Sequence, residues 1–121
     1  MRLFALRGAC HVDRNESAPI LDATEELMRE LLRRNDLSAE DVVSCVFTVT
    51  EALDAEFPAV AARRAGFERV PLLCAREIPV PGSMPGVIRV LMHYHAPEAH
   101  VPQHVYLGET ARLRTDLTAA Q

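Results

Sequence analysis

Three charged residues lie in segments of the sequence that are otherwise apolar. Arg89 interrupts the run Val-Ile-Arg-Val-Leu-Met, Arg7 follows Leu-Phe-Ala-Leu, and Glu77 ends the run that starts at Val70. An unpaired buried charge is costly, so each of these residues needs a counter-charge, water or a ligand. One interpretation is a structural ion pair between Glu77 and one arginine, with the other arginine reaching solvent. The other is an arginine-lined cavity for a small anion, because a guanidinium group binds a carboxylate through two hydrogen bonds.

The balance of embedded charges favours the anion-binding interpretation. Glu77 is the one embedded acid that opposes arginines from four separate segments, namely Arg7, Arg63, Arg89 and Arg114. An anionic small molecule would balance this surplus of positive charge.

Histidine and cysteine offer weaker alternatives. His93 and His95 alternate along one expected strand, and two strand histidines can bind zinc together with further ligands from a loop. His100 and His104 follow at loop spacing, but no nearby acid or cysteine completes a familiar zinc motif. Cys74 could be a nucleophile, although lone cysteines in apolar strands are usually packing residues. All 13 basic residues are arginine, which excludes Schiff-base chemistry on lysine and a P-loop lysine.

Apolar periodicity predicts the elements that position these residues. We expect strands at residues 2–10, 42–50, 70–77, 87–95 and 104–107, and helices at 17–35 and 58–64. Ser17 or Asn15 is expected to cap the first helix and Asn35 to end it. This order predicts an α/β or α+β fold with a mixed sheet and helices on one face. The other face then needs a covering partner, for which oligomerisation is the obvious candidate.

Length and composition limit the classes of function. The 121 residues fit one domain spanning 1–121, with a loose tail from residue 115 to 121. So small a chain does not easily build a deep private cleft, so an enclosed pocket would form more readily between subunits. The net charge of -4 argues against non-specific binding to nucleic acid or anionic membranes.

The cysteines and the apolar segments predict a cytoplasmic protein. Cys10, Cys45 and Cys74 are odd in number and lack C-x-x-C spacing, which favours a reduced compartment. The apolar stretch at the amino terminus is too short for a signal peptide, and no run is long enough for a membrane helix.

Seven short motifs, taken in their order and spacing, extend over nearly the whole chain. They are Leu6-Arg7-Gly8-Ala9, Glu40-Asp41-Val42-Val43, Phe57-Pro58-Ala59, Val70 to Glu77, Ile88 to Met92, His104 to Leu107 and Leu113-Arg114. Together they resemble the small monofunctional chorismate mutases of the trimeric barrel type. The resemblance implies a homotrimer whose sheets form the core of a pseudo-barrel, with active sites between subunits. It also implies the Claisen rearrangement of chorismate to prephenate, a unimolecular reaction that requires no metal and no cofactor.

The resemblance assigns four catalytic residues. Arg89 would donate to the ether oxygen that becomes negative as the C–O bond breaks, and to a carboxylate. Arg7 would bind the side-chain carboxylate of the substrate. Glu77 would accept a hydrogen bond from the ring hydroxyl, with Cys74 and the backbone of Leu73 beside it.

Five further residues would bind the substrate around this centre. The Tyr106 hydroxyl would bind the side-chain carboxylate together with Arg7. Arg63 and Arg114 would guide or cover the ring carboxylate near the mouth of the site. Phe57 and Leu113 would pack against the substrate.

Three positions depart from the family pattern. Leu73 stands where relatives often have threonine, Val60 replaces a basic residue, and Thr115 replaces a proline. These changes affect the mouth and tail, and we expect them to alter substrate capture more than the chemical step. Two other functions remain open at this point: a non-catalytic trimeric binding protein for a carboxylate metabolite, and a deaminase-like hydrolase with an interface arginine.

Overall fold

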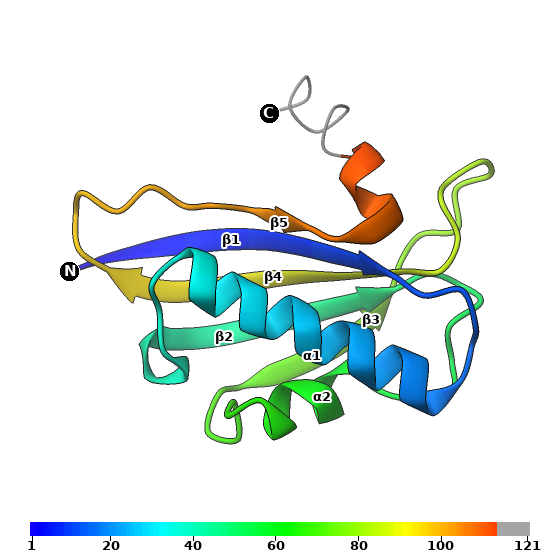
Figure 1. Ribbon diagram of the computed structural model, residues 1–121, viewed down its shortest axis with the longest axis horizontal. Coiled ribbons are helices and arrows are strands. Elements are labelled where there is room, and N and C mark those ends of the chain that lie inside the picture. Colours follow the sequence, from blue (N-terminus) through cyan, green and yellow to red (C-terminus); the bar gives the residue numbers. More distant parts are fainter. Residues whose placement is uncertain (114–121) are drawn as a thin grey trace.

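Five strands form one mixed sheet in the computed structural model, which describes residues 1–113 (Figure 1). The strands are β1 (Arg2–His11), β2 (Val42–Val49), β3 (Leu72–Arg76), β4 (Val87–Ala96) and β5 (Val105–Tyr106). Their order across the sheet is β3-β2-β4-β1-β5. The central strand β4 pairs antiparallel with β1 and β2, whereas the two edge strands β3 and β5 pair in parallel. The predicted mixed sheet of an α+β fold is confirmed.

Both helices lie on the same face of the sheet (Figure 1). They are α1 (Ser17–Arg34) and α2 (Pro58–Arg64), and two short 3-10 turns lie at Ala39–Asp41 and Gly108–Arg112. Sequence analysis predicted both helices but not the 3-10 turn at 108–112. No helix within residues 1–113 is long and apolar enough to cross a membrane.

The core lies between the sheet and α1. Even-numbered residues of β1 from Phe4 onwards, and those of β4, face the helices and are buried, for example Leu6 and Met92. Gly8 lies in the middle of β1, where an added Cβ would approach Leu27 and Leu31 of α1 to 3.1 Å. The glycine therefore allows close packing of α1 against β1.

Neither α1 nor α2 lies on the other face of the sheet (Figure 1), where Ala9 and Val87 are buried but several other side chains are exposed. Odd-numbered residues of β4 point to it, including Arg89 and Leu91. Three leucines on this open face are substantially exposed: Leu3 is 54%, Leu73 is 63% and Leu91 is 39% accessible. Exposed leucines on the same face as Arg7 and Arg89 are the pattern expected of a face that binds another molecule.

Three strands are shorter than the sequence predicts, although β2 lacks only the last expected residue and ends at Val49. β3 begins at Leu72 rather than Val70, because Pro71 has no N–H for the sheet ladder. β5 contains Val105–Tyr106 alone. Directly before β5, the Nδ1 atom of His104 accepts a hydrogen bond from the backbone N–H of Arg7 at 3.0 Å. The His104 side chain therefore takes the place of a backbone carbonyl as the acceptor for this N–H of β1.

The expected cap of the first helix is wrong. Glu16 occupies the N-cap position, and no side chain caps the helix. Asn15 instead accepts the backbone N–H groups of Asp54 and Ala55, both at 3.0 Å. The Asn15 side chain therefore binds a distant loop instead of capping the helix. Sequence periodicity gives no information about such a long-range contact.

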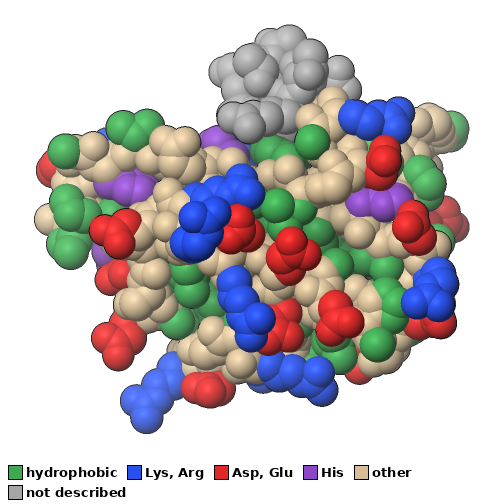
Figure 2. Space-filling model, viewed as in Figure 1, with side chains coloured by type: hydrophobic (Ala, Val, Ile, Leu, Met, Phe, Trp, Pro, Cys, Tyr) green, Lys and Arg blue, Asp and Glu red, His purple; other side chains and the backbone are tan. Residues whose placement is uncertain are grey.

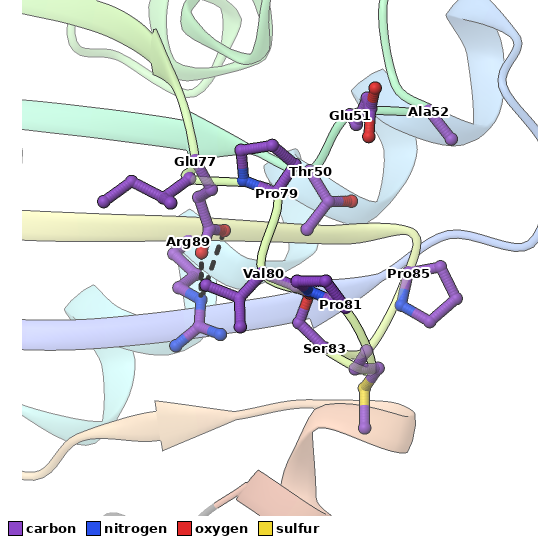
Figure 3. Close-up of a pocket in the computed structure, with 12 residues that line it drawn as sticks. Thr50, Glu51, Ala52, Glu77, Pro79, Val80, Pro81, Ser83, Pro85 and Arg89 are labelled. Atoms are coloured by element: carbon purple, nitrogen blue, oxygen red, sulfur yellow. Dashed lines mark hydrogen bonds and ion pairs between the residues drawn. The ribbon is translucent and has the colours of Figure 1, made fainter.

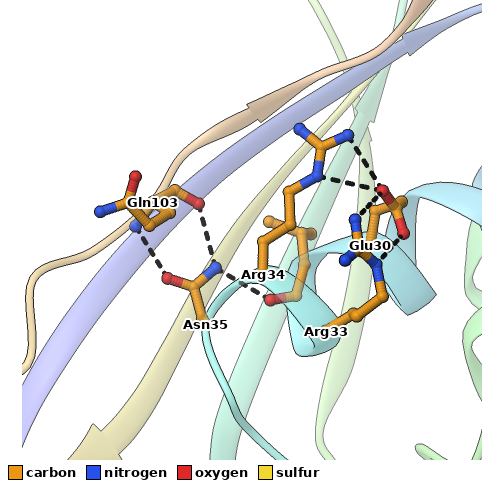
Figure 4. Close-up of polar contacts among 6 residues, drawn as sticks. Glu30, Arg33, Arg34, Asn35 and Gln103 are labelled. Atoms are coloured by element: carbon orange, nitrogen blue, oxygen red, sulfur yellow. Dashed lines mark hydrogen bonds and ion pairs between the residues drawn. The ribbon is translucent and has the colours of Figure 1, made fainter.

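The outer face of α1 carries alternating acidic and basic side chains, and Figure 2 shows this mixed charge on the helix side of the molecule. Glu30 binds both Arg33 and Arg34, and Arg29 pairs with Glu25 (Figure 4 shows the first set). Hydrogen bonds from Arg33 and Arg34 lower the pKa of Glu30 to about 2. This face is therefore a solvated surface and carries no site residue.

Asn35 ends α1 as predicted and joins it to the segment before β5 (Figure 4). Its amide nitrogen donates to the carbonyl groups of Leu31 at 2.9 Å and Gln103 at 3.0 Å, and its oxygen accepts the backbone N–H of Gln103 at 2.7 Å. Asn35 is buried, so water does not replace these bonds readily.

Asn35→Ala is expected to lower the free energy of unfolding by about 2 kcal/mol, because it leaves buried backbone groups without partners. Urea denaturation measures the change. Gln103→Ala is the matched control, because both bonds from Asn35 to this residue use its backbone. Equal stability of the Asn35→Ala protein and the wild type would show that the hydrogen bonds of Asn35 do not stabilise the fold.

Candidate active site

Arg89 and Glu77 meet on the open face of the sheet (Figure 3). Arg89 comes from β4, and Glu77 directly follows the last residue of β3. The Nε atom of Arg89 lies 3.1 Å from Oε1 and 3.2 Å from Oε2 of Glu77. Both contacts use Nε, and the terminal nitrogens of the guanidinium group point away from the carboxylate (Figure 3). The ion pair between Glu77 and one arginine thus forms, while the two terminal nitrogens of the Arg89 guanidinium group, here called its fork, are directed away from Glu77.

The pair lines an open cleft of about 530 Å³. The segment of residues 78–85 forms one wall and contains three prolines, which limit the number of conformations that the loop can adopt. Thr50, Glu51 and Ala52 form another part of the lining. The side chain of Arg89 is 38% accessible and that of Glu77 is 21% accessible. A cleft of this size with a cationic fork suits a small anionic molecule.

Arg7 and Tyr106 lie on the same face of the sheet as Arg89. In the sheet register, Ala9 of β1 pairs with Arg89 on one side and with Tyr106 on the other. Arg7 lies two residues from Ala9 along β1, so its side chain leaves the same face. Because Ala9 is small, three polar side chains surround it without a bulky residue between them. The structure thus brings four predicted site residues to one face.

Phe57 and Cys74 lie elsewhere. They line a separate cavity of about 300 Å³ beside β3 and the start of α2. Cys74 pairs in register with Phe47, whose side chain is buried towards the helices, so Cys74 points to the opposite side of the sheet from Arg89. Phe57 is 67% accessible. Within one chain, these two residues and the arginine cleft form two separate groups.

The remaining predicted residues lie at the margins of these groups. Leu73 is exposed on the open face of β3, and Arg63 is exposed on α2. Leu113 lines a third cavity, of about 680 Å³, with His11 and Arg112. Arg114, Thr115 and the expected tail of residues 115–121 lie outside the described residues.

Two of the three cysteines are packing residues. Burial raises the pKa of the Cys10 thiol, with a smaller contribution from Glu26, and burial raises that of the Cys45 thiol; both reach about 12. Cys74 is the partly accessible thiol, and all three are free. The buried pair therefore remains protonated and unreactive at neutral pH.

The histidines have separate local contacts. The Tyr94 hydroxyl and Nε2 of His100 are 2.7 Å apart, and Nδ1 of His93 lies 3.2 Å from the Ser44 hydroxyl. Within residues 1–113, no three His, Cys, Asp or Glu side chains lie close enough together to hold a metal ion.

The lining of the cleft contains residues that sequence reasoning missed. The expected elements leave residues 78–86 between two strands with no role in the site, and Thr50 is expected only as the end of the strand at residues 42–50. A signal was present: three prolines and two glycines directly follow Glu77, which indicates a shaped loop rather than a loose one. Nothing in the sequence alone indicates that Thr50 lies near them.

The fold and the cleft define an α+β protein with arginines on one face of a mixed sheet. The family model for chorismate mutase type I matches residues 3–117. Chorismate mutase AroH of Thermus thermophilus is 50% identical over 119 residues, covering 96% of this chain and 97% of that protein. Chorismate mutase AroH of Bacillus subtilis is 37% identical over 123 residues, covering 98% and 94%.

Solved structures agree with the sequence comparisons. A chorismate mutase from Clostridium thermocellum superposes with a TM-score of 0.86 at 41% identity, covering 90% of this chain and 98% of that chain. The chain belongs to the chorismate mutase type I family, and the protein is a chorismate mutase, an isomerase. The resemblance seen in the sequence is confirmed, and the binding-protein alternative is not favoured.

Proposed function

We propose that this chain rearranges chorismate to prephenate, for aromatic amino acid biosynthesis, by restraining the substrate and stabilising its developing charge. The contact of Arg89 with Glu77 through Nε is the observation that carries the proposal, because it leaves the guanidinium fork directed away from its partner. The reaction breaks one C–O bond and forms one C–C bond within the same molecule. Its chemical requirements are therefore a folded substrate and an electrostatic environment that favours the transition state.

Arg89 is proposed to donate from its terminal nitrogens to the ether oxygen and to a substrate carboxylate. The ether oxygen gains negative charge as its bond to carbon stretches, so a cation held beside it binds the transition state more strongly than the ground state. Glu77 holds Arg89 in place through Nε. A carboxylate oxygen of Glu77 has a second lone pair, which would accept a hydrogen bond from the ring hydroxyl of the substrate.

Arg7 and Tyr106 are proposed to bind the side-chain carboxylate. Both leave the same sheet face as Arg89: Arg7 is on β1, which neighbours β4, and Tyr106 is on β5, which neighbours β1. Three separate elements then hold the flexible arm of the substrate over its ring, which reduces the entropy that must be lost in the chemical step.

The complete site is proposed to form between subunits of a homotrimer. The Phe57–Cys74 cavity and the arginine cleft are separate within one chain, and the exposed leucines of the open face need a partner. We propose that the Phe57–Cys74 cavity of one subunit completes the cleft of its neighbour, with Arg63, Leu73, Leu113 and Arg114 at the margins. The three sheets would then form the core of a pseudo-barrel. The free thiols agree with a reduced cytoplasmic location.

Loss of chorismate absorbance with the purified protein tests the activity, and sedimentation tests the assembly. We expect saturable turnover by a species of three subunits. Absence of any rate acceleration at all substrate concentrations would favour a non-catalytic binding protein. A stable, fully active monomer would contradict the shared site.

A further inference from the structure

We propose that Thr50 is a positioning residue for this reaction: its hydroxyl holds the start of β4 so that Arg89 and Glu77 keep their catalytic geometry. The inference rests on the proposed function of that pair. Thr50 directly follows β2 and lies in the wall of the cleft (Figure 3). The proposal does not require Thr50 to contact the substrate.

Thr50 binds both backbone groups of Val87, the first residue of β4. Its N–H donates to the Val87 carbonyl at 3.1 Å, and its hydroxyl oxygen accepts the Val87 N–H at 3.0 Å. Val87 is fully buried, and the Thr50 hydroxyl is the acceptor that satisfies its N–H. Arg89 follows two residues later on the same strand.

The residue before Thr50 fixes Glu77. The Glu77 N–H donates to the carbonyl of Val49 at 2.9 Å. Two adjacent residues at the end of β2 therefore hold both members of the ion pair, one through Glu77 itself and the other through the start of β4. A shift of this strand end would change the distance between Arg89 and Glu77 directly.

The residue before β4, Gly86, is also held in place, by a hydrogen bond from the segment that follows β1. The Val12 N–H donates to the Gly86 carbonyl at 2.8 Å, and Gly86 has a φ of +68°. A Cβ on Gly86 would lie 2.3 Å from the carbonyl oxygen of Val12, so the glycine is required. Among these contacts, the Thr50 hydroxyl is the one that a side-chain substitution can remove without changing the backbone groups.

Thr50→Val, Thr50→Ser and Thr24→Val test the proposal. Thr50→Val retains the shape of the side chain and loses the acceptor, and we expect kcat to fall about tenfold with KM within about twofold, because small misplacements of catalytic groups lower the rate steeply. Thr50→Ser retains the hydroxyl and should recover kcat to within about twofold. Thr24 is the matched control: its buried hydroxyl donates to the Ile20 carbonyl at 2.7 Å within α1, and Thr24→Val should leave kcat unchanged.

Circular dichroism and sedimentation first establish whether each variant folds and assembles. An unchanged kcat in Thr50→Val, an equal loss in Thr50→Ser, or an equal loss in Thr24→Val would overturn the inference. So would failure of Thr50→Val to fold, because the role would then be structural alone. Arg89→Ala separates this inference from the proposed function: if Arg89→Ala loses turnover and Thr50→Val does not, the positioning role alone is wrong.

Discussion

Arg89→Ala is expected to lower kcat for chorismate at least about a hundredfold, the loss that follows removal of one transition-state donor. Arg89 is the cation that lies in the cleft with its fork directed away from Glu77 (Figure 3). Without it, the ether oxygen would develop its charge with no fixed positive group beside it. The decrease in chorismate absorbance at saturating substrate measures kcat, and thermal denaturation shows whether the variant remains folded.

Two further substitutions test why kcat falls when Arg89 is removed. Arg89→Lys should recover little activity, because an ammonium group cannot donate in the planar fork geometry of a guanidinium group. Arg29→Ala is the matched control, because it removes an exposed arginine that pairs with Glu25 on the outer face of α1. Near-normal turnover in folded Arg89→Ala would remove Arg89 from its proposed role.

Two inactive variants are expected to restore activity when their subunits are mixed. Arg89→Ala inactivates the cleft, and Phe57→Asp places a negative charge where the anionic substrate would bind. Phe57 is 67% accessible in the single chain, so aspartate should not disturb the fold. In a randomly mixed trimer population, about a quarter of the sites combine an intact cleft with an intact Phe57–Cys74 cavity. Co-expression should therefore recover about a quarter of wild-type turnover from two variants that are each nearly inactive.

The control for subunit mixing carries both substitutions in one chain. Co-expression of this double variant with Arg89→Ala produces no intact cleft, so no activity should return. Differently tagged subunits that co-purify would establish that mixing has occurred. Mixed trimers without recovered activity would show that one subunit supplies the whole site.

Local sequence patterns predicted most elements of the fold. The helix at Ser17–Arg34 follows from its apolar stripe and from Asn35, and the strand at Val87–Ala96 follows from its run of β-branched and apolar residues. Two of the errors occurred where a side chain forms a hydrogen bond with the backbone of a distant segment. Asn15 binds a loop rather than capping its helix, and His104 replaces a backbone acceptor beside β1.

The candidate site was predicted unevenly. The unusual positions of Arg89 and Glu77 were evident from their apolar neighbours, and the structure places the two side chains in contact. Their contact through Nε, which leaves the fork directed away, depends on the paths of β3 and β4 and was not predictable. The separation of Phe57 and Cys74 from the arginine cleft depends on the face of β3 to which Cys74 points and on the position of the start of α2, where Phe57 lies.

The sequence by itself determined the chemical inventory: arginines and one acid within apolar strands, two helices, and a sheet with an uncovered face. Tertiary structure decided which of these residues meet. Alternation along a strand specifies that neighbouring side chains take opposite faces, but pairing register and strand order specify which residues lie side by side. Thr48 and Ala9 flank Arg89, and Thr50 holds Val87, through pairings between segments about forty to eighty residues apart. Such contacts arise from packing of the whole sheet, and no local pattern encodes them.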